Sequence, residues 1–227
     1  MPMPQIIINS SSLDSQNQAS TLQSVNCGPF FNAFVESQKK GYETPDGKVK
    51  KKGISSLGAS NLRTETAEIM SHCNPHNAVS RPETTHLVFG YVQSGKTMSF
   101  TALTALARDN GYRVVVYLAG TKTNLRDQTA ERLEKDLIKN IKGNKNYFKI
   151  HPDPQEADVD DIIGHLSLST KPIVLIPILK HHLHIEKLAA IFSNEDMKEA
   201  LANETVLIVD DEADQASLNS YARWNSS

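Results

Sequence analysis

The stretch FGYVQSGKTMSF, from Phe89 to Phe100, places two glycines, a lysine and a threonine between apolar residues. It matches the pattern Gly-x-x-x-x-Gly-Lys-Ser/Thr through Gly90, Gly95, Lys96 and Thr97. Such a loop joins a strand to a helix, and its backbone N–H groups bind phosphate oxygens at the start of that helix. Lys96 would then contact the β- and γ-phosphates, and the Thr97 hydroxyl would bind Mg²⁺. An ordinary strand-to-helix turn would explain the glycines, but not the adjacent lysine and threonine.

Short apolar runs rich in Val, Ile and Leu recur from Thr85 onward, and helical patterns separate them. The runs are 85–90 (THLVFG), 113–120 (RVVVYLAG), 171–179 (KPIVLIPIL) and 204–212 (ETVLIVDDE). Each run is continuous rather than alternating, which is typical of strands buried on both faces of a parallel sheet. Helical spacing occupies 100–106 and 125–141, and a further short helix is expected at 162–168. We therefore predict a three-layer α/β fold in which helices cover a mainly parallel sheet.

The N-terminal part of the chain has a different composition. Residues 1–25 are rich in Ser, Asn and Gln and are expected to form a flexible leader. Residues 26–82 have few apolar positions and one helical pattern, TETAEIMSHC at 64–73, so we predict a small irregular or helical cap or subdomain. The α/β lobe is expected to occupy residues 83–227.

The composition excludes several classes of protein. The net charge of −2 gives no overall field that would attract nucleic acid or an acidic membrane, so any polyanion must bind to a local surface. The two cysteines, Cys27 and Cys73, are too few for a disulfide framework and fit a reducing compartment. No secretory signal or membrane-spanning run is recognisable, and we expect a cytoplasmic protein.

A second chemical element follows the last apolar run. Val206–Val209 leads directly into Asp210, Asp211 and Glu212, at the carboxyl end of an expected strand, where open α/β sheets bind ligands. Mg²⁺ bound to a threonine hydroxyl also needs a carboxylate, and hydrolysis needs a base that orients water. The acidic group supplies candidates for both roles, whereas the alternative is a capping cluster at the start of a helix.

The spacing between the two elements narrows the class of protein. Lys96 and Asp211 are separated by 211 − 96 = 115 positions, which include two further strand runs. With a glutamate directly after the predicted metal aspartate, this arrangement resembles the RecA-like ATPases rather than GTPases or nucleotide kinases. The resemblance implies a RecA-like P-loop NTPase fold and ATP as the nucleotide.

Longer strings make the resemblance more specific. DEAD at 211–214 is similar to motif II of superfamily-two helicases and translocases. GTKTNLRDQTAERL, at 120–133, lies where that superfamily contacts the nucleic-acid backbone. GYVQSGKT and LIVDDEADQASLN resemble most closely the Z-one domain family of P-loop ATPases, which is associated with endonucleases and with phage defence and DNA restriction in bacteria. The resemblance covers 87–219.

The resemblance assigns roles to individual residues. Gln93 and Ser94 belong to the family's variant of the phosphate loop, Asp211 would hold Mg²⁺ through water, and Glu212 would polarise the attacking water. Asp210 could instead share the metal role. The nucleic-acid motif is matched by position at Thr121, Lys122, Leu125 and Gln128. Residues that would couple the nucleotide state to a neighbouring lobe are Asp214, Gln215, Ser217 and Asn219.

By this resemblance the chain is the first lobe of a helicase-like ATPase that acts on nucleic acid, with DNA as the expected substrate. In superfamily-two motors a second RecA-like lobe supplies an arginine to the transition state. Only 227 − 214 = 13 residues follow the acidic motif, so we expect that lobe in the same full-length chain or in a partner chain, and weak ATPase activity without it. Two alternatives stay open: a nucleotide-sensing regulatory or interaction module, and an ATP-linked endonuclease component.

Other tempting clusters favour simpler explanations. The histidines of KHHLHIE (181, 182 and 184) and the group His72, Cys73 and His76 lack the four-ligand spacing of structural zinc sites, so polar loop or strand-end roles are expected. Asp153 follows a proline in an expected loop, and 196–198 (DMK) is expected on an exposed helix face, so no nuclease centre is recognised. The lysines at 48–52 and 139–149 are interpreted as solvated surface.

Overall fold

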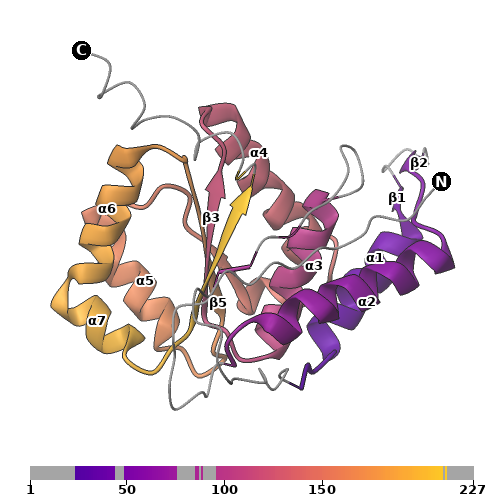
Figure 1. Ribbon diagram of the computed structural model, residues 1–227, viewed down its shortest axis with the longest axis horizontal. Helices are drawn as coiled ribbons and strands as arrows, with labels where there is room; N and C mark the ends of the chain where they lie inside the picture. The colour runs from indigo at the N-terminus through magenta and orange to yellow at the C-terminus, as the bar shows by residue number, and fades with distance from the viewer. Residues whose placement is uncertain are drawn as a thin grey trace, which may run out of the picture. The chain divides into compact units, whose positions relative to one another are not determined.

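The computed structural model describes residues 24–43, 49–75, 85, 86, 88, 96–211 and 213. The chain divides into two compact units, Met1–Gly111 and Tyr112–Ser227, which are described separately (Figure 1). The division falls between Gly111 and Tyr112, so the helix that follows the glycine-rich loop belongs to the first unit. Among the described residues, no helix combines the length and the apolar character needed to cross a membrane.

In the described part of the first unit, three helices pack together: α1 (Pro29–Lys40), α2 (Ser56–His72) and α3 (Lys96–Asp109). A short antiparallel pair, β1 (Tyr42–Glu43) and β2 (Val49–Lys51), joins α1 to α2. The buried residues of α1 recur at helical spacing, at Phe31, Phe34, Val35 and Gln38. The helical pattern expected at 64–73 is confirmed as the second half of α2, whereas α1 was not predicted.

The N-terminus of α1 is capped from a distant part of the sequence. Its own N-cap residue, Gly28, makes no side-chain bond, and the Asp109 carboxylate at the end of α3 accepts the backbone N–H groups of Phe30 at 3.2 Å and Phe31 at 2.8 Å. A Cβ atom on Gly28 would lie 2.5 Å from Asp109 Oδ1, so the approach requires glycine. Burial raises the pKa of Asp109, and the two N–H bonds oppose that shift.

The second unit contains a four-stranded sheet in which every neighbouring pair is parallel. The order across the sheet is β4-β5-β3-β6. The strands are β3 (Val114–Ala119), β4 (Phe148–Ile150), β5 (Ile173–Ile178) and β6 (Val206–Asp211). Val114 lies opposite both Val174 of β5 and Val206 of β6, which sets the register. The predicted α/β fold with a parallel sheet is confirmed at this level.

Helices connect the strands of the second unit and cover both faces of the sheet (Figure 1). They are α4 (Thr123–Leu133), α5 (Val159–Leu166), α6 (His182–Ser193) and α7 (Glu195–Leu201), with a π-helical turn, η1 (Glu134–Lys139), and two 3-10 turns, η2 (Asn144–Asn146) and η3 (Glu156–Asp158). The connection from β3 to β4 crosses the sheet in the opposite direction to the connections from β4 to β5 and from β5 to β6. Right-handed crossovers therefore place α4 on one face and α5, α6 and α7 on the other.

The core of the second unit lies between the sheet and helices α5, α6 and α7. Val116 and Ile176 from the central strands pack with Ile162 of α5, Leu188 of α6 and Met197 of α7, and all five are buried. β5 is buried along its whole length, as its continuous apolar run predicts. The runs at 113–120, 171–179 and 204–212 are confirmed as strands, and the run at 85–90 lies largely outside the described residues.

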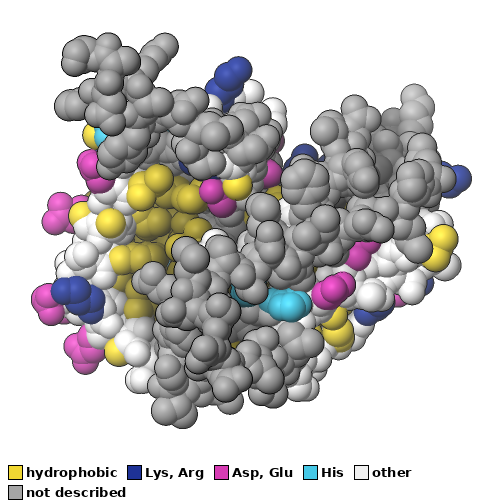
Figure 2. All heavy atoms as spheres, viewed as in Figure 1, with side chains coloured by type: hydrophobic (Ala, Val, Ile, Leu, Met, Phe, Trp, Pro, Cys, Tyr) yellow, Lys and Arg dark blue, Asp and Glu magenta, His cyan; other side chains and the backbone are white. Residues whose placement is uncertain are grey.

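One expectation about the sheet and one about a helix are wrong. β6 is not buried on both faces, because Ile208 is 62% exposed, and among the described residues β6 pairs with β3 alone. Figure 2 shows hydrophobic side chains gathered beside α6 and α7. Partly buried Leu118, Phe192 and Val206 pack against the core cluster of the second unit. The helix expected over 125–141 ends as an α-helix at Leu133, since the backbone widens into η1, where Asn140 N–H bonds to Lys135 O.

A buried arginine joins the amino ends of the strands. Arg113, just before β3, is 5% exposed, and its guanidinium donates to Pro172 O at 3.0 Å and to Leu166 O at 2.7 Å. Its Nη1 lies 3.3 Å from Glu204 Oε1, ahead of β6. Burial lowers the pKa of Arg113 and the Glu204 carboxylate opposes that shift, but a guanidinium stays charged in either case. One side chain thereby ties β3 to the start of β5, to the end of α5 and to the segment before β6.

Candidate functional site

The predicted phosphate loop lies mostly outside the described residues. Gly90, Gln93, Ser94 and Gly95 are in that part of the chain. The described part of α3 runs from Lys96 to Asp109, so Lys96 and Thr97 are helical. A helix at the lysine and the threonine is the local structure that the glycine-rich pattern predicts. Phosphate binding by this loop stays a prediction.

The acidic pair lies at the carboxyl end of β6. Asp210 and Asp211 are opposite Leu118 and Ala119, the last residues of β3. Because side chains alternate along a strand, Asp210 shares a face with Val206, on the side of α5, α6 and α7, and Asp211 points to the other face.

Lys180 forms an ion pair with Asp210, the first of the two aspartates. Its Nζ lies 2.8 Å from Asp210 Oδ1, and the lysine side chain is only 10% exposed. The Asp210 carboxylate therefore already has a cationic partner, whereas Asp211 presents its carboxylate on the opposite face of the sheet. Of the two alternatives, this geometry favours Asp211 for a metal. Glu212 and the predicted coupling residues Asp214, Gln215, Ser217 and Asn219 lie outside the described residues.

The predicted nucleic-acid residues lie near the same edge of the sheet. Thr121 and Lys122 form the exposed turn between β3 and α4, and Gln128 is exposed on α4. The turn starts with Gly120, which has a φ of 65°, a left-handed conformation that favours glycine. The backbone N–H of Lys180 donates a 2.7 Å hydrogen bond to Gly120 O. The turns that follow β3 and β5 are thus joined by a backbone hydrogen bond, beside the Lys180–Asp210 pair.

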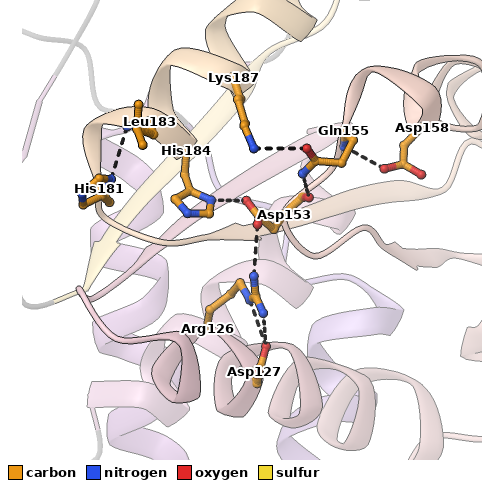
Figure 3. Close-up of polar contacts among 9 residues, drawn as sticks. All are labelled: Arg126, Asp127, Asp153, Gln155, Asp158, His181, Leu183, His184 and Lys187. Carbon is orange, nitrogen blue, oxygen red and sulfur yellow. Dashed lines mark hydrogen bonds and ion pairs between the residues drawn. The ribbon is translucent and has the colours of Figure 1, made fainter.

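A polar cluster that the sequence did not predict consists of Arg126, Asp153 and His184, and we name it the Asp153 cluster. Figure 3 shows Arg126 and His184 converging on the Asp153 carboxylate from two sides. Arg126 Nη1 lies 3.1 Å from one carboxylate oxygen, and His184 Nδ1 lies 2.5 Å from the other. The three side chains are 17–22% exposed, which strengthens their electrostatic interaction compared with a pair in water.

The parallel sheet explains how these three residues meet. Arg126 lies on α4 after β3, Asp153 follows β4, and His184 lies in the first turn of α6 after β5. The carboxyl ends of parallel strands meet at one edge, so the segments that follow them converge there. Asp153 adopts φ of 49°, a left-handed conformation that Asp tolerates better than most residues. The loop expected at Pro152 and Asp153 is confirmed, but the Asp153 carboxylate is partly buried and paired.

In the described part of the chain, neither cluster considered for metal binding brings three potential ligand atoms together. His181 caps α6, and its ring accepts the Leu183 N–H at 3.4 Å, while His184 belongs to the Asp153 cluster. His72 and Cys73 end α2, and His76 lies outside the described residues. A different group, His151, Asp161 and His165, has three potential ligand atoms within 4.8 Å of one another.

The described site is therefore a carboxyl-terminal sheet edge with Asp211 on one face and the Lys180–Asp210 pair on the other. The Asp153 cluster lies along the same edge, after β4 and β5. Lys96 and Thr97 belong to the first unit and the acidic pair to the second. Comparison with protein-family models, with curated proteins and with solved structures gave no match for this chain.

Proposed function

We propose that the chain is an ATP-binding, Mg²⁺-dependent P-loop ATPase lobe with a RecA-like fold, similar to the Z-one family and to superfamily-two helicases, and that it acts on nucleic acid, with DNA as the substrate. One observation carries the proposal. The last strand of a parallel sheet, β6, ends in an acidic pair, in a chain whose sequence places a glycine-rich pattern directly before the helical residues Lys96 and Thr97.

The sheet topology supports this function. Every neighbouring pair of strands in the four-stranded sheet is parallel, and open parallel sheets bind ligands at the carboxyl ends of their strands. Asp210, Asp211, Thr121 and Lys122 all lie at these ends, on the adjacent strands β6 and β3 or in the turn after β3. The residues with proposed chemistry thus occupy the edge where a nucleotide and its polymer substrate would be bound.

Of the two aspartates at the end of β6, one carboxylate rather than both would bind a hydrated Mg²⁺ ion. Lys180 forms an ion pair with the Asp210 carboxylate, whereas the Asp211 side chain lies on the opposite face of the sheet. Asp211 and the Thr97 hydroxyl would hold the ion, which would neutralise charge on the β- and γ-phosphates. Lys96 would bind the same phosphates, and Glu212 would accept a proton from the attacking water.

Paired variants test this assignment. Purified protein is assayed for ATP binding and for Mg²⁺-dependent phosphate release, with Asp211→Asn compared with its neighbour Asp210→Asn. Asp211→Asn should lose turnover, whereas Asp210→Asn should keep most of it, because its carboxylate pairs with Lys180 on the other face. Lys96→Ala should lose nucleotide binding, and Glu212→Gln should bind ATP without hydrolysing it. If Lys96→Ala and Glu212→Gln bind and hydrolyse ATP as the parent does, the proposal is wrong.

The nucleic-acid part of the proposal has a separate test. Thr121, Lys122 and Gln128 are exposed, so their side chains are accessible to a phosphate backbone. Binding of single-stranded and duplex DNA should weaken as salt rises, and Lys122→Ala should reduce the slope of log K against log salt by about 1. Binding without salt dependence, or no binding by a chain that does bind ATP, would instead favour a nucleotide sensor.

A further inference from the structure

Two histidines and an aspartate meet on the side of the sheet that α5 covers. His151 follows β4 directly, and its backbone N–H bonds to Leu175 O at 2.9 Å, so it continues the pairing with β5. Asp161 and His165 lie four residues apart on α5 and therefore on the same face of that helix. His151 Nε2 and His165 Nδ1 are 3.0 Å apart. A carboxylate oxygen of Asp161 and one ring nitrogen of each histidine lie within 4.8 Å of one another.

The contact between the two imidazoles is itself informative. Their ring planes are tilted by 58°, and two ring nitrogens at this distance share one proton, because one must donate and the other accept. In a neutral imidazole the proton can move to the far nitrogen of the same ring, which leaves both facing nitrogens with lone pairs. A cation can then take the place of the shared proton, and the protein gains no net charge from the exchange of tautomers.

We propose that His151 Nε2, His165 Nδ1 and the Asp161 carboxylate bind a divalent transition-metal ion of the zinc class. This site is distinct from the proposed Mg²⁺ site, and it does not depend on the proposed ATPase function.

The distances suit such an ion. Ligand nitrogens about 2.0–2.1 Å from a tetrahedral zinc ion lie about 3.3–3.4 Å from each other. The two histidines need to separate by only a few tenths of an ångström from their 3.0 Å contact. Asp161 is exposed, so its carboxylate can rotate toward the ion without disturbing the core. Two imidazoles and one carboxylate favour zinc, cobalt or nickel over Mg²⁺ and leave at least one position for water.

The ligand set also suits a divalent ion in charge. Neutral imidazole is the form of histidine that coordinates metals, and the Asp161 carboxylate adds a negative charge.

Metal binding would have a structural consequence in the second unit. The ion would join the end of β4 to the middle of α5 and close the intervening loop, 152–158. That loop carries Asp153, the centre of the Asp153 cluster. Zinc would thereby hold in place the backbone from which Asp153 meets Arg126 and His184.

Metal titration tests the proposal. Protein treated with chelator and then dialysed is titrated with ZnCl₂ by calorimetry, and CoCl₂ is followed by its visible absorption. We expect one ion per chain, a higher unfolding temperature with zinc, and a cobalt spectrum of imidazole and carboxylate ligation. His165→Ala should weaken zinc binding at least tenfold, because loss of an outer-shell partner alone costs about 10–100-fold in metal affinity.

Matched controls separate this site from surface binding. Asp161→Asn should weaken binding, whereas Asp160→Asn, at the exposed neighbouring position, should not. His182→Ala, an exposed histidine of α6, should bind zinc like the parent. If circular dichroism shows that His165→Ala is misfolded, Asp161→Asn decides the question, since its side chain is exposed. Absence of one-to-one binding, or equal binding by Asp161→Asn and the parent, would overturn the proposal. Lys96→Ala should retain zinc binding, so failure of the ATPase proposal would leave this result unchanged.

Discussion

Replacing Arg113 with methionine tests whether a single buried guanidinium holds the amino ends of the strands together. Arg113→Met keeps an unbranched, apolar side chain but removes every donor. Leu166 O and Pro172 O, both on buried residues, would lose their bonds of 2.7 and 3.0 Å. Glu204 would lose its cationic partner but is 26% exposed, so water can replace part of that interaction.

The expected cost follows from these three contacts. Leaving a buried carbonyl without a donor costs about 1–3 kcal/mol, and the partly exposed carboxylate adds less than about 1 kcal/mol. With two carbonyls affected, we therefore expect a loss of about 2–7 kcal/mol in the free energy of unfolding of the second unit. For a chain of this length such a loss lowers the unfolding temperature by about 4–28 °C.

Hydrogen exchange of β3 and β5 amides measures this loss within the second unit, and urea denaturation gives the total with its m-value. Glu204→Gln is the control, because it removes only the charge of the exposed partner and should cost less than about 1 kcal/mol. The reasoning is refuted if Arg113→Met changes the stability by less than about 1 kcal/mol. It is also refuted if Glu204→Gln costs as much as Arg113→Met, since the ion pair would then outweigh the two carbonyl bonds.

Three further predictions concern the first unit. Asp109→Ala should lower stability by about 0.5–2 kcal/mol, because the first turn of α1 loses the acceptor of the Phe30 and Phe31 N–H groups; chemical denaturation measures it. The pKa of Asp109 is raised in the folded state, so the stability gained from this shift is greatest below the unfolded-state pKa of about 3.9 and is lost as pH rises through the folded-state pKa. The stability of the parent relative to Asp109→Asn should therefore fall over that range of pH. A difference that does not change with pH would contradict the burial argument. Burial raises the pKa of Cys73 to about 11, so a thiol reagent at pH 8 should modify exposed Cys27 rapidly and Cys73 slowly, with equal rates as the contrary result.

The sheet was predictable where strands are long and buried. β3 and β5 follow continuous runs of Val, Ile and Leu, because both faces of each strand are covered and every position must be apolar. β4 has only three residues, Phe148–Ile150, and a run that short carries no periodic signal. α1 was missed although Phe31, Phe34 and Val35 form a helical stripe, because the fourth buried residue of the helix, Gln38, is polar and interrupts the apolar pattern.

The site was predictable only in part, for a topological reason. Asp211 and Lys96 belong to local strings whose spacing predicts their chemistry. The Asp153 cluster draws one residue from each of three separate connections, so nothing in the local sequence around Arg126, Asp153 or His184 indicates that they meet. A usable signal was that all three follow closely on strands of one parallel sheet. Which aspartate pairs with Lys180 was likewise beyond the sequence, because it depends on the alternation and register of β6.

The position of β6 in the sheet has a consequence for synthesis on the ribosome. Val114 of β3 lies opposite Val206 of β6, 206 − 114 = 92 residues later in the chain. At about 5–20 residues per second, the ribosome needs roughly 5–20 s to make this interval. Throughout that time the side of β3 that β6 will occupy is open to unrelated nascent chains, so this is the period in which a chaperone would most improve the yield of folded protein.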